Sequence, residues 1–295
     1  MKGYKGFKKD LTCMGFKFEE GKTYIIDGAI KLCKKGFHFC ENPFDVADYY
    51  DITDSDFAEV ESGENTLAEG DKTVTSEIKI GVRLGLKGWI NACVDFAMKN
   101  SKPGDKVQSA SGDSSQLAAS GYSSKLAASG DFSQLAASGY SSQLAASGYS
   151  SQLAASGDFS QLAASGDSSK LAASGDFSQL AASGDSSKLA ASGYSSQLAA
   201  SGYSSQLAAS GDSSQLAASG DSSKLAASGY SSVVAGIGVD NMAKAVKGCW
   251  IVLAEWVIVD TKRIPKYVKS VKVDGKKIKA NTWYKLKNGK FVVAQ

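Results

Sequence analysis

The side chains of this 295-residue chain that could do chemistry are few, and most lie near its amino end. His38 is the only histidine, and it stands in the spacing Cys33-x4-His38-x-Cys40. On a strand His38 and Cys40 point to the same face, and an approach of Cys13 would complete a Cys3His zinc site. The spacing is not that of a zinc knuckle, and the alternative is a half-buried histidine among small apolar thiols. We therefore expect no bound metal.

Motifs for catalysis or cofactor binding are scarce. A lone histidine argues against Ser-His-Asp or Cys-His catalysis, unless His38 is itself the base. Neither a Gly-x-x-x-x-Gly-Lys phosphate loop nor a Gly-x-Gly-x-x-Gly turn precedes a plausible helix. We expect no cofactor, and we favour a protein that is not an enzyme.

Short strands and two helices would position these side chains. Alternating or aromatic-rich runs predict strands at Gly3–Phe7, Gly15–Phe18, Gly36–Cys40 and Phe57–Glu61. Asn42 before Pro43 predicts a helix start, with Phe44, Ala47 and Tyr50 on one face, and a second helix is expected at about Leu86–Lys99. Residues 1–100 are thus expected to form a small α/β head domain.

Two resemblances bear on the head. The stretch Met1-Lys-Gly-Tyr-Lys-Gly-Phe, together with Lys35-Gly-Phe-His-Phe-Cys-Glu-Asn-Pro-Phe and Phe57-Ala-Glu-Val-Glu, resembles an uncharacterised module of bacteriophage and prophage proteins. This resemblance implies an origin in a phage genome and no mechanism.

The head also resembles ADP-ribosyltransferase-type folds, through a Tyr-x-Gly-like strand opening and a Gly-Phe-x-Phe strand before a helix that ends in tyrosines. The resemblance implies that Tyr4, His38 and Tyr49 would line a nicotinamide site. Glu59 or Glu61 would polarise the ribose. His38, Glu59 and Glu61 are therefore the catalytic candidates of this alternative, a nucleotide-using head for which the rest of the chain is a spacer.

Thirteen near-copies of the nonapeptide Ser-Gly-(Asp/Tyr)-(Ser/Phe)-Ser-(Gln/Lys)-Leu-Ala-Ala run from Ser111 to Ala227, and a fourteenth, from Ser228, decays. Glycine every nine residues disfavours a helix, and unbroken register with a constant leucine disfavours a flexible linker. We predict a mostly β protein whose centre is a parallel β-solenoid, with a glycine-permitted turn before each short strand and leucine inward. Two or three repeats could make one turn, and the thin core favours two, hence seven coils and a rod about 34 Å tall.

The nine-residue step resembles that of the calcium-binding β-roll. With its apolar position superposed on Leu117, Ser115 stands where that family has a ligand aspartate. We expect the shape without the ion.

Variation within the repeat falls on the third and fourth positions. The third is Asp or Tyr, and the fourth becomes Phe three times. Aromatic side chains at turns could form a ladder that binds a protein partner. The alternative is that these exposed positions vary without selection for binding and only keep the scaffold soluble. The expected binding surface comprises Tyr122, Tyr140, Tyr149, Tyr194, Tyr203, Tyr230, Phe132, Phe159 and Phe177.

The carboxy-terminal segment differs in charge from the rest. Residues 231–295 carry 13 basic and 4 acidic side chains, a net charge of +9 hidden in a chain total of +3. Asp274-Gly275 and Asn288-Gly289 predict hairpins between strands at Val268–Val273, Lys276–Lys279 and Trp283–Lys287. The residues that could contact a nucleic acid are Lys272, Lys276, Lys277, Lys279, Lys285, Lys287 and Trp283.

We therefore expect a head at 1–100, a linker or amino-terminal solenoid cap at 101–110, a β-solenoid at 111–256 that is regular to about 235, and a basic β-hairpin cap at 257–295. Five cysteines without framework spacing, and no signal peptide or membrane-spanning run, suggest a cytoplasmic protein of the phage host. The favoured function is non-enzymatic binding or structure, with a protein partner that could be a host factor. Nucleic-acid binding is an alternative. We expect no membrane partner, and the sequence is compatible with a homo-oligomer.

Overall fold

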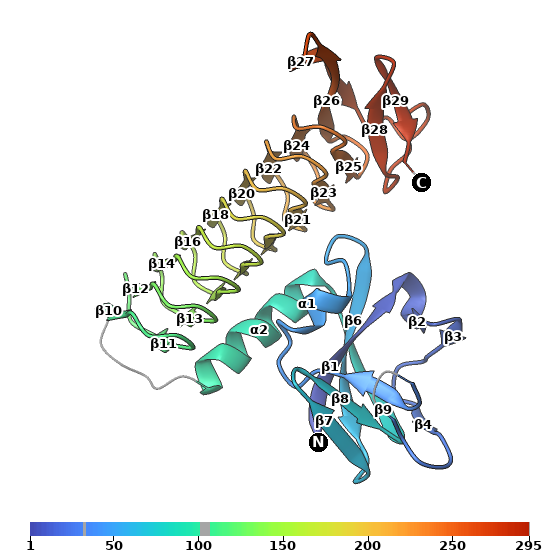
Figure 1. The fold of residues 1–295 in the computed structure, drawn as a ribbon, viewed down its shortest axis with the longest axis vertical. Coiled ribbons are helices and arrows are strands. Elements are labelled where there is room, and N and C mark those ends of the chain that lie inside the picture. Colours follow the sequence, from blue (N-terminus) through green and yellow to red (C-terminus); the bar gives the residue numbers. More distant parts are fainter. Residues whose placement is uncertain (32–33, 101–106, 295) are drawn as a thin grey trace. The chain divides into compact units, whose positions relative to one another are not determined.

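The computed structural model describes residues 1–31, 34–100 and 107–294, and the chain divides into two compact units, Met1–Phe96 and Ala97–Gln295 (Figure 1). The first unit is a small domain of mostly antiparallel strands. The second is a parallel β-solenoid that ends in antiparallel hairpins. The expected fold class is confirmed.

The head is an antiparallel half-barrel. Its main sheet has the strand order β3-β2-β1-β6-β9-β4, and a smaller sheet has the order β5-β8-β7. Phe7, Phe18, Val60, Ile78 and Ile80 are buried together between strands and form its core. The strands are β1 (Lys2–Lys8), β2 (Thr12–Cys13), β3 (Phe16–Lys17), β4 (Thr23–Ile25), β5 (Phe37–Phe39), β6 (Ser55–Ser62), β7 (Thr66–Glu69), β8 (Lys72–Thr75) and β9 (Glu77–Leu84).

The two head helices differ in how well the sequence indicated them. The second, α2 (Leu86–Asn100), is close to the expected range, with Trp89, Ile90 and Cys93 buried. The side chains of Val94 and Ala97 lie outside the described residues. The helix expected from Asn42 is wrong in extent, because α1 spans only Val46–Tyr49. Asn42 instead accepts a hydrogen bond from the Phe44 amide at 3.1 Å, which closes a turn before the helix.

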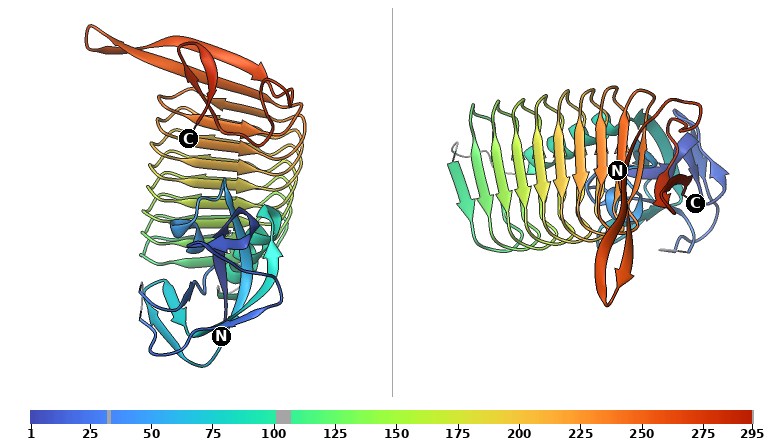
Figure 2. Two further views of the ribbon diagram at one scale, coloured as in Figure 1. Left: turned by 90° about the vertical axis from the view of Figure 1, so that its right-hand side faces the viewer. Right: turned by 90° about the horizontal axis from the view of Figure 1, so that it is seen from above.

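The solenoid consists of two parallel sheets (Figures 1 and 2). Each strand pairs with the strand 18 residues on, so that Leu171 lies beside Leu189 and Leu180 beside Leu198. Two nonapeptides therefore make one turn, as the thin core predicted. Strands before and after the regular repeats join the stack, which gives about eight turns rather than seven.

Each repeat contributes one four-residue strand. The even-numbered sheet contains β10 (Val107–Ala110), β12 (Lys125–Ala128), β14 (Gln143–Ala146), β16 (Gln161–Ala164), β18 (Gln179–Ala182), β20 (Gln197–Ala200), β22 (Gln215–Ala218), β24 (Val233–Gly236) and β26 (Trp250–Val259). The odd-numbered sheet contains β11 (Gln116–Ala119), β13 (Gln134–Ala137), β15 (Gln152–Ala155), β17 (Lys170–Ala173), β19 (Lys188–Ala191), β21 (Gln206–Ala209), β23 (Lys224–Ala227) and β25 (Met242–Ala245).

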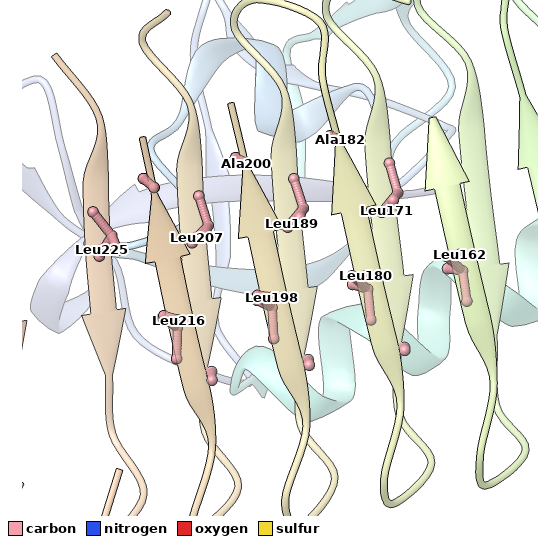
Figure 3. Packing of buried hydrophobic residues seen from close by; sticks show 14 of the residues in the cluster. Leu162, Leu171, Leu180, Ala182, Leu189, Leu198, Ala200, Leu207, Leu216 and Leu225 are labelled. Carbon is pink, nitrogen blue, oxygen red and sulfur yellow. The ribbon is translucent and has the colours of Figure 1, made fainter. Parts of the chain in front are cut away.

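Leucine and alanine fill the space between the two sheets. The leucine and the second alanine of each strand point inward because side chains alternate along a strand. Figure 3 shows the leucines of neighbouring strands lying in rows, and Leu171, Leu189 and Leu207 are at most 1% exposed. Each buried leucine contributes roughly 1.5–3 kcal/mol, so the stack gains its stability coil by coil.

The expected role of glycine in the turn is wrong in one respect. Positive φ falls not on the glycine but on the fourth residue, such as Ser186 at 56° and Phe177 at 55°. The glycine is needed because successive coils touch there: a Cβ on Gly184 would lie 2.3 Å from the carbonyl oxygen of Gly166, one coil earlier. Stacking, rather than a left-handed backbone, excludes a side chain at this position.

The fifth residue of the repeat, a buried serine, completes the turn. Ser187 Oγ donates a hydrogen bond to the Gly184 carbonyl at 2.8 Å, and its own carbonyl accepts the Gln206 amide at 2.9 Å. Most repeats repeat this pattern, for example at Ser178 and Gly175. Serine therefore satisfies, inside the turn, a backbone acceptor that water would otherwise have to reach.

The carboxy-terminal segment continues the solenoid and then closes it. Strand β26 pairs with β27 (Lys262–Lys272) in a long ribbon that runs past the edge of the coils (Figure 2), and the Asp260–Thr261 turn has φ of 45° and 69°. The register shifts between Glu255 and Trp256, opposite Pro265, which explains how a proline is tolerated in a strand.

Two hairpin predictions in this segment have different outcomes. Asn288-Gly289 does join β28 (Tyr284–Lys287) to β29 (Lys290–Val293). The hairpin expected at Asp274-Gly275 is wrong, since Lys276–Lys279 is not a strand. Asp274 instead accepts the amides of Lys276 and Ile278 at 2.8 and 3.0 Å in a compact loop, and these bonds lower the pKa of its carboxyl. Ile278, Tyr284 and Leu286 join the end of the leucine core.

Candidate functional site

Aromatic rings form a continuous ladder along one edge of the solenoid, in the turns that enter the even-numbered strands. Five consecutive coils each contribute one ring, and neighbouring ring centroids lie 5.0, 5.2, 5.0 and 5.7 Å apart. The rings are between 40 and 64% exposed. We call these residues the aromatic ladder: Tyr122, Tyr140, Phe159, Phe177 and Tyr194.

The rings of the aromatic ladder come from two different positions of the repeat, yet they form one continuous row. Its tyrosines are the third residue of the repeat and its phenylalanines are the fourth. Phe159 and Phe177 both have φ of 55°, a left-handed conformation that bulky side chains rarely adopt. Their rings nevertheless stack at 5.0 Å with planes 12° apart. The ring is kept in line at the expense of local backbone strain.

Aspartate at the third position has a separate, structural role. Oδ1 of Asp158 accepts the backbone N–H of Asp176 at 2.8 Å, and Oδ1 of Asp176 accepts that of Tyr194 at 2.7 Å. All eight aspartates of the repeats hold the next coil in this way. An Asp-Phe turn therefore carries both this side-chain bond between coils and the ring, whereas a Tyr-Ser turn carries the ring and only backbone bonds to the next coil.

The other predicted aromatic residues are dispersed. Phe132 and Tyr149 meet edge-on at 5.7 Å in the turns that enter the odd-numbered strands, and Tyr203 is three coils beyond Tyr149. Tyr230 shares the edge of the aromatic ladder, but Asp212 occupies the turn between it and Tyr194. The structure thus brings together five of the nine predicted binding residues.

A pocket of about 240 Å³ lies in the head, and sequence reasoning missed its most unusual residue. Lys5, on β1, is 6% exposed, and its Nζ donates to the His38 carbonyl at 2.8 Å. The ring of Tyr50 lies against Gly6, where a Cβ would be 2.3 Å from it. The lining also includes Tyr4, Cys13, Met14, Phe39, Cys40, Val46, Tyr49 and Lys72.

Burial dominates the electrostatics of this pocket. It lowers the pKa of the Lys5 ammonium, an effect that the Cys13 and Cys40 thiols oppose. Burial, helped by the charges of Lys5 and Lys72, also lowers the pKa of His38. Burial, with the charges of Asp45 and Asp71, raises the pKa of the Cys40 thiol to about 12, and Cys40 is therefore a poor nucleophile.

The pocket's tyrosines are held in their neutral form. Burial raises the pKa of Tyr49, whose hydroxyl donates to Asp71 at 2.5 Å, and the Lys72 ammonium lies 3.8 Å from the Tyr49 ring centroid. Burial also raises the pKa of Tyr50, whose hydroxyl lies 3.3 Å from the Cys13 thiol. These hydroxyls therefore keep their protons at neutral pH and act as hydrogen-bond donors.

Three of the four residues weighed as zinc ligands line this same pocket: Cys13, His38 and Cys40. Cys33 lies outside the described residues. Within those that are described, no three side chains of the ligating types are placed to hold a metal ion. The Lys5 amine, which donates a hydrogen bond to the His38 carbonyl, lies close to Cys13 and Cys40.

The residues of the ADP-ribosyltransferase-like alternative divide between two hollows. His38 and Tyr49 line the Lys5 pocket, whereas Glu59 and Glu61 line another of about 310 Å³, and Tyr4 borders both. Glu59 lies directly across from Tyr4 in the sheet, so it projects from the face opposite to that of Lys5. Burial, and then the charge of Glu59, raise the pKa of Tyr4.

The basic segment exposes most of its predicted contacts. Lys272, Lys276, Lys277, Lys279 and Lys287 are exposed, and within residues 107–294 none of them forms an ion pair. Lys285 is half-buried. Trp283 is half-buried too, and its ring centroid lies 4.6 Å from the Lys244 ammonium.

The arrangement defines a β-solenoid repeat protein with a small antiparallel domain at its amino end. Residues 1–92 match the model of a family described as a domain of unknown function (DUF7666), so the chain is an N-terminal DUF7666 domain followed by the solenoid. No curated protein and no solved structure matches the chain. In the described ranges, neither helix has the length and apolar character to span a membrane.

Proposed function

We propose that the solenoid is a non-enzymatic scaffold that binds a protein partner through the aromatic ladder. The observation that supports this most directly is the alignment of five exposed rings on consecutive coils. Contiguous exposed aromatic surface is characteristic of interaction sites. Phe159 and Phe177 also support binding, because both have a left-handed backbone that is strained for a bulky side chain. Without selection for the ring, we would expect serine, which other repeats have at the same position.

The chemistry of the partner follows from the ladder's surroundings. Asp158 and Asp176 lie beside the rings, and no lysine or arginine occurs in the turns of the regular repeats. A surface of lysine or arginine with apolar side chains would complement this edge through cation–π and charge contacts. We further propose that a phage or prophage encodes the protein, because its head resembles a module of phage and prophage proteins. The partner would then be a host protein in the cytoplasm.

At the fourth position of the repeat, serine is a substitution that the fold already accepts, whereas the third position is always Asp or Tyr. Phe159→Ser and Phe177→Ser restore the residue found at this position in most other repeats, and Tyr140→Ser and Tyr194→Ser remove two more rings. A matched control replaces Phe132, Tyr149 and Tyr203 by serine on the other edge. Partners captured by the full-length protein from host extract are identified by mass spectrometry, and the affinity of each purified candidate is then measured by calorimetry.

The expected result is a partner whose affinity falls at least about tenfold, or about 1.4 kcal/mol, with the ladder variant and is unchanged with the control. Equal affinity for both variants would reject the aromatic ladder as the binding surface. Circular dichroism of both variants establishes that the solenoid is retained.

Nucleic-acid binding by the basic segment is a second candidate, favoured by its five exposed lysines without ion pairs. Deleting the segment would uncover the leucine core, so charge reversal is the better test. We expect Lys276→Glu, Lys277→Glu and Lys279→Glu to weaken binding to duplex DNA and to reduce its salt dependence. An affinity that is unchanged, or that does not depend on salt, would eliminate this candidate.

A further inference from the structure

The geometry of the head points to a covalent binding site separate from the solenoid. We propose that Lys5 forms an imine with a small aromatic aldehyde or ketone bound in the 240 Å³ pocket. This activity does not depend on the function proposed for the aromatic ladder. It rests on the placement of one amine, on the groups around it and on the space before it.

Lys5 is a buried amine without a carboxylate partner, and the thiols of Cys13 and Cys40 are the acidic groups close to it. Its Nζ has the His38 carbonyl at 2.8 Å as acceptor, and the Phe7 ring centroid lies 5.5 Å away. No carboxylate in the described part of the head pairs with it, in contrast to Lys2 and Lys9, which face Glu61 and Asp56 at 3.7 Å. A buried ammonium in such surroundings is costly unless it is paired. The neutral amine avoids that cost.

A neutral amine is a nucleophile. The lowered pKa of Lys5 increases the fraction of the amine that carries a free lone pair near neutral pH, as in lysines that form Schiff bases. The neighbouring thiol of Cys40 is held protonated by burial, and so does not compete for an electrophile.

The shape and lining of the pocket define the class of ligand. A volume of about 240 Å³ admits a molecule of about one ring. Phe39, Tyr49 and Tyr50 contribute aromatic walls, and Val46 and Met14 contribute apolar ones. These groups favour a planar aromatic carbonyl compound over a flexible polar one.

The reaction needs no reagent other than the carbonyl compound. The Nζ lone pair attacks the carbonyl carbon, a C–N bond forms, and the π electrons move to oxygen. A proton passes from nitrogen to that oxygen and gives the carbinolamine. The hydroxyl oxygen then gains a proton, the C–O bond breaks as the nitrogen lone pair forms the C=N bond, water leaves, and the nitrogen gives up its remaining proton to replace the one taken up by the oxygen. The Cys13 thiol and Tyr50 hydroxyl, 3.3 Å apart beside the pocket, can relay these protons.

Reductive trapping tests the proposal on the full-length protein. Salicylaldehyde is supplied below one equivalent at neutral pH with sodium cyanoborohydride, and the modified lysines are located by peptide mass spectrometry. We expect Lys5 to be the principal site of modification among 31 lysines. In urea this preference should vanish, since it depends on the folded pocket.

Two variants sharpen the result. Lys5→Met should lose the principal adduct, whereas Lys8→Met, an exposed position of the same strand, should keep it. If Lys5→Met fails to fold, as judged by circular dichroism, the positions of the adducts in the wild-type protein still test the proposal. Modification of Lys2 and Lys8 ahead of Lys5 in the folded protein would overturn the proposal.

Discussion

Oδ1 of Asp185 accepts a 2.7 Å hydrogen bond from the backbone N–H of Tyr203, the residue at the same position one coil further along. The amide of Asp185 donates in turn to Asp167 at 2.8 Å. Each aspartate thus adds a side-chain bond between two coils in the turns, beside the backbone bond from Ser186 N–H to the Tyr203 carbonyl at 2.7 Å. At the third position, Asp therefore provides a side-chain bond along the rod and Tyr provides an exposed ring, and an Asp followed by Phe provides both.

Removing one such bond should destabilise the solenoid locally. We expect Asp185→Ala to cost about 1 kcal/mol, because the bond is charge-assisted but solvent-accessible. Asp185→Asn should cost less, since it retains an oxygen acceptor and relieves repulsion from Asp167. Hydrogen exchange of the Tyr203 amide measures both effects. An amide that exchanges equally fast in the wild type and the alanine variant would show that the bond contributes nothing.

The space around a repeat glycine differs between the middle of the solenoid and its first coil. A Cβ on Gly184 would meet the backbone of the preceding coil at 2.3 Å, whereas a Cβ on Gly112 meets only Ser115 Oγ, at 4.0 Å. Gly184→Ala should therefore separate two coils and cost at least about 1–3 kcal/mol. Gly112→Ala should be neutral or stabilise by about 0.4–1 kcal/mol through the unfolded chain. Thermal melting followed by circular dichroism compares them, and similar midpoints would contradict the stacking explanation.

The left-handed fourth position predicts the opposite outcome for two substitutions of the same serine. Ser186, at φ 56°, should be replaced favourably by Asn, which tolerates this conformation, and unfavourably by Val, whose β-branched side chain does not. A difference of about 1–2 kcal/mol between the two is expected. Chemical denaturation measures it. A valine variant as stable as the asparagine variant would mean that the turn can change its backbone.

The repeat could be predicted because its signal is strictly periodic. Leucine every nine residues within a glycine- and serine-rich unit left the solenoid as the consistent solution, and the size of the core favoured two repeats per turn. The role of Gly184 could not be predicted, since the sequence does not distinguish a glycine required by φ from one required by a neighbouring coil. The aromatic ladder needed the 18-residue turn, which brings position four of one repeat beside position three of another.

The head pocket had a weaker signal that could have been used. Gly3, Lys5 and Phe7 occupy every second position of β1, so the period of a strand places Lys5 on the face that includes Phe7, although Gly6 between them is buried as well. A lysine at an inward position is unusual. Its partners come from β5 and from the Cys13 region, and contacts between such distant segments are not encoded in local spacing.

Lys5 should also make the stability of the head depend on pH in a defined direction. Burial lowers its pKa in the folded state below the usual 10.5, so between these two values the unfolded chain binds more protons than the folded one. The free energy of unfolding must therefore rise with pH in this window through Lys5. Cys40, raised from 9.0 to about 12, acts in the opposite sense above pH 9, as do Tyr49 and Tyr50 above pH 10.

The comparison of wild type with Lys5→Met isolates the lysine from these opposing groups. The wild type should gain stability relative to the variant as the pH increases toward 10.5. Trp89 is the tryptophan of the head, so urea unfolding is followed by its fluorescence after Trp250, Trp256 and Trp283 have been replaced by Phe. A stability difference that stays constant over this range would mean that Lys5 titrates at its usual pKa, and the neutral amine on which imine formation depends would be absent at neutral pH.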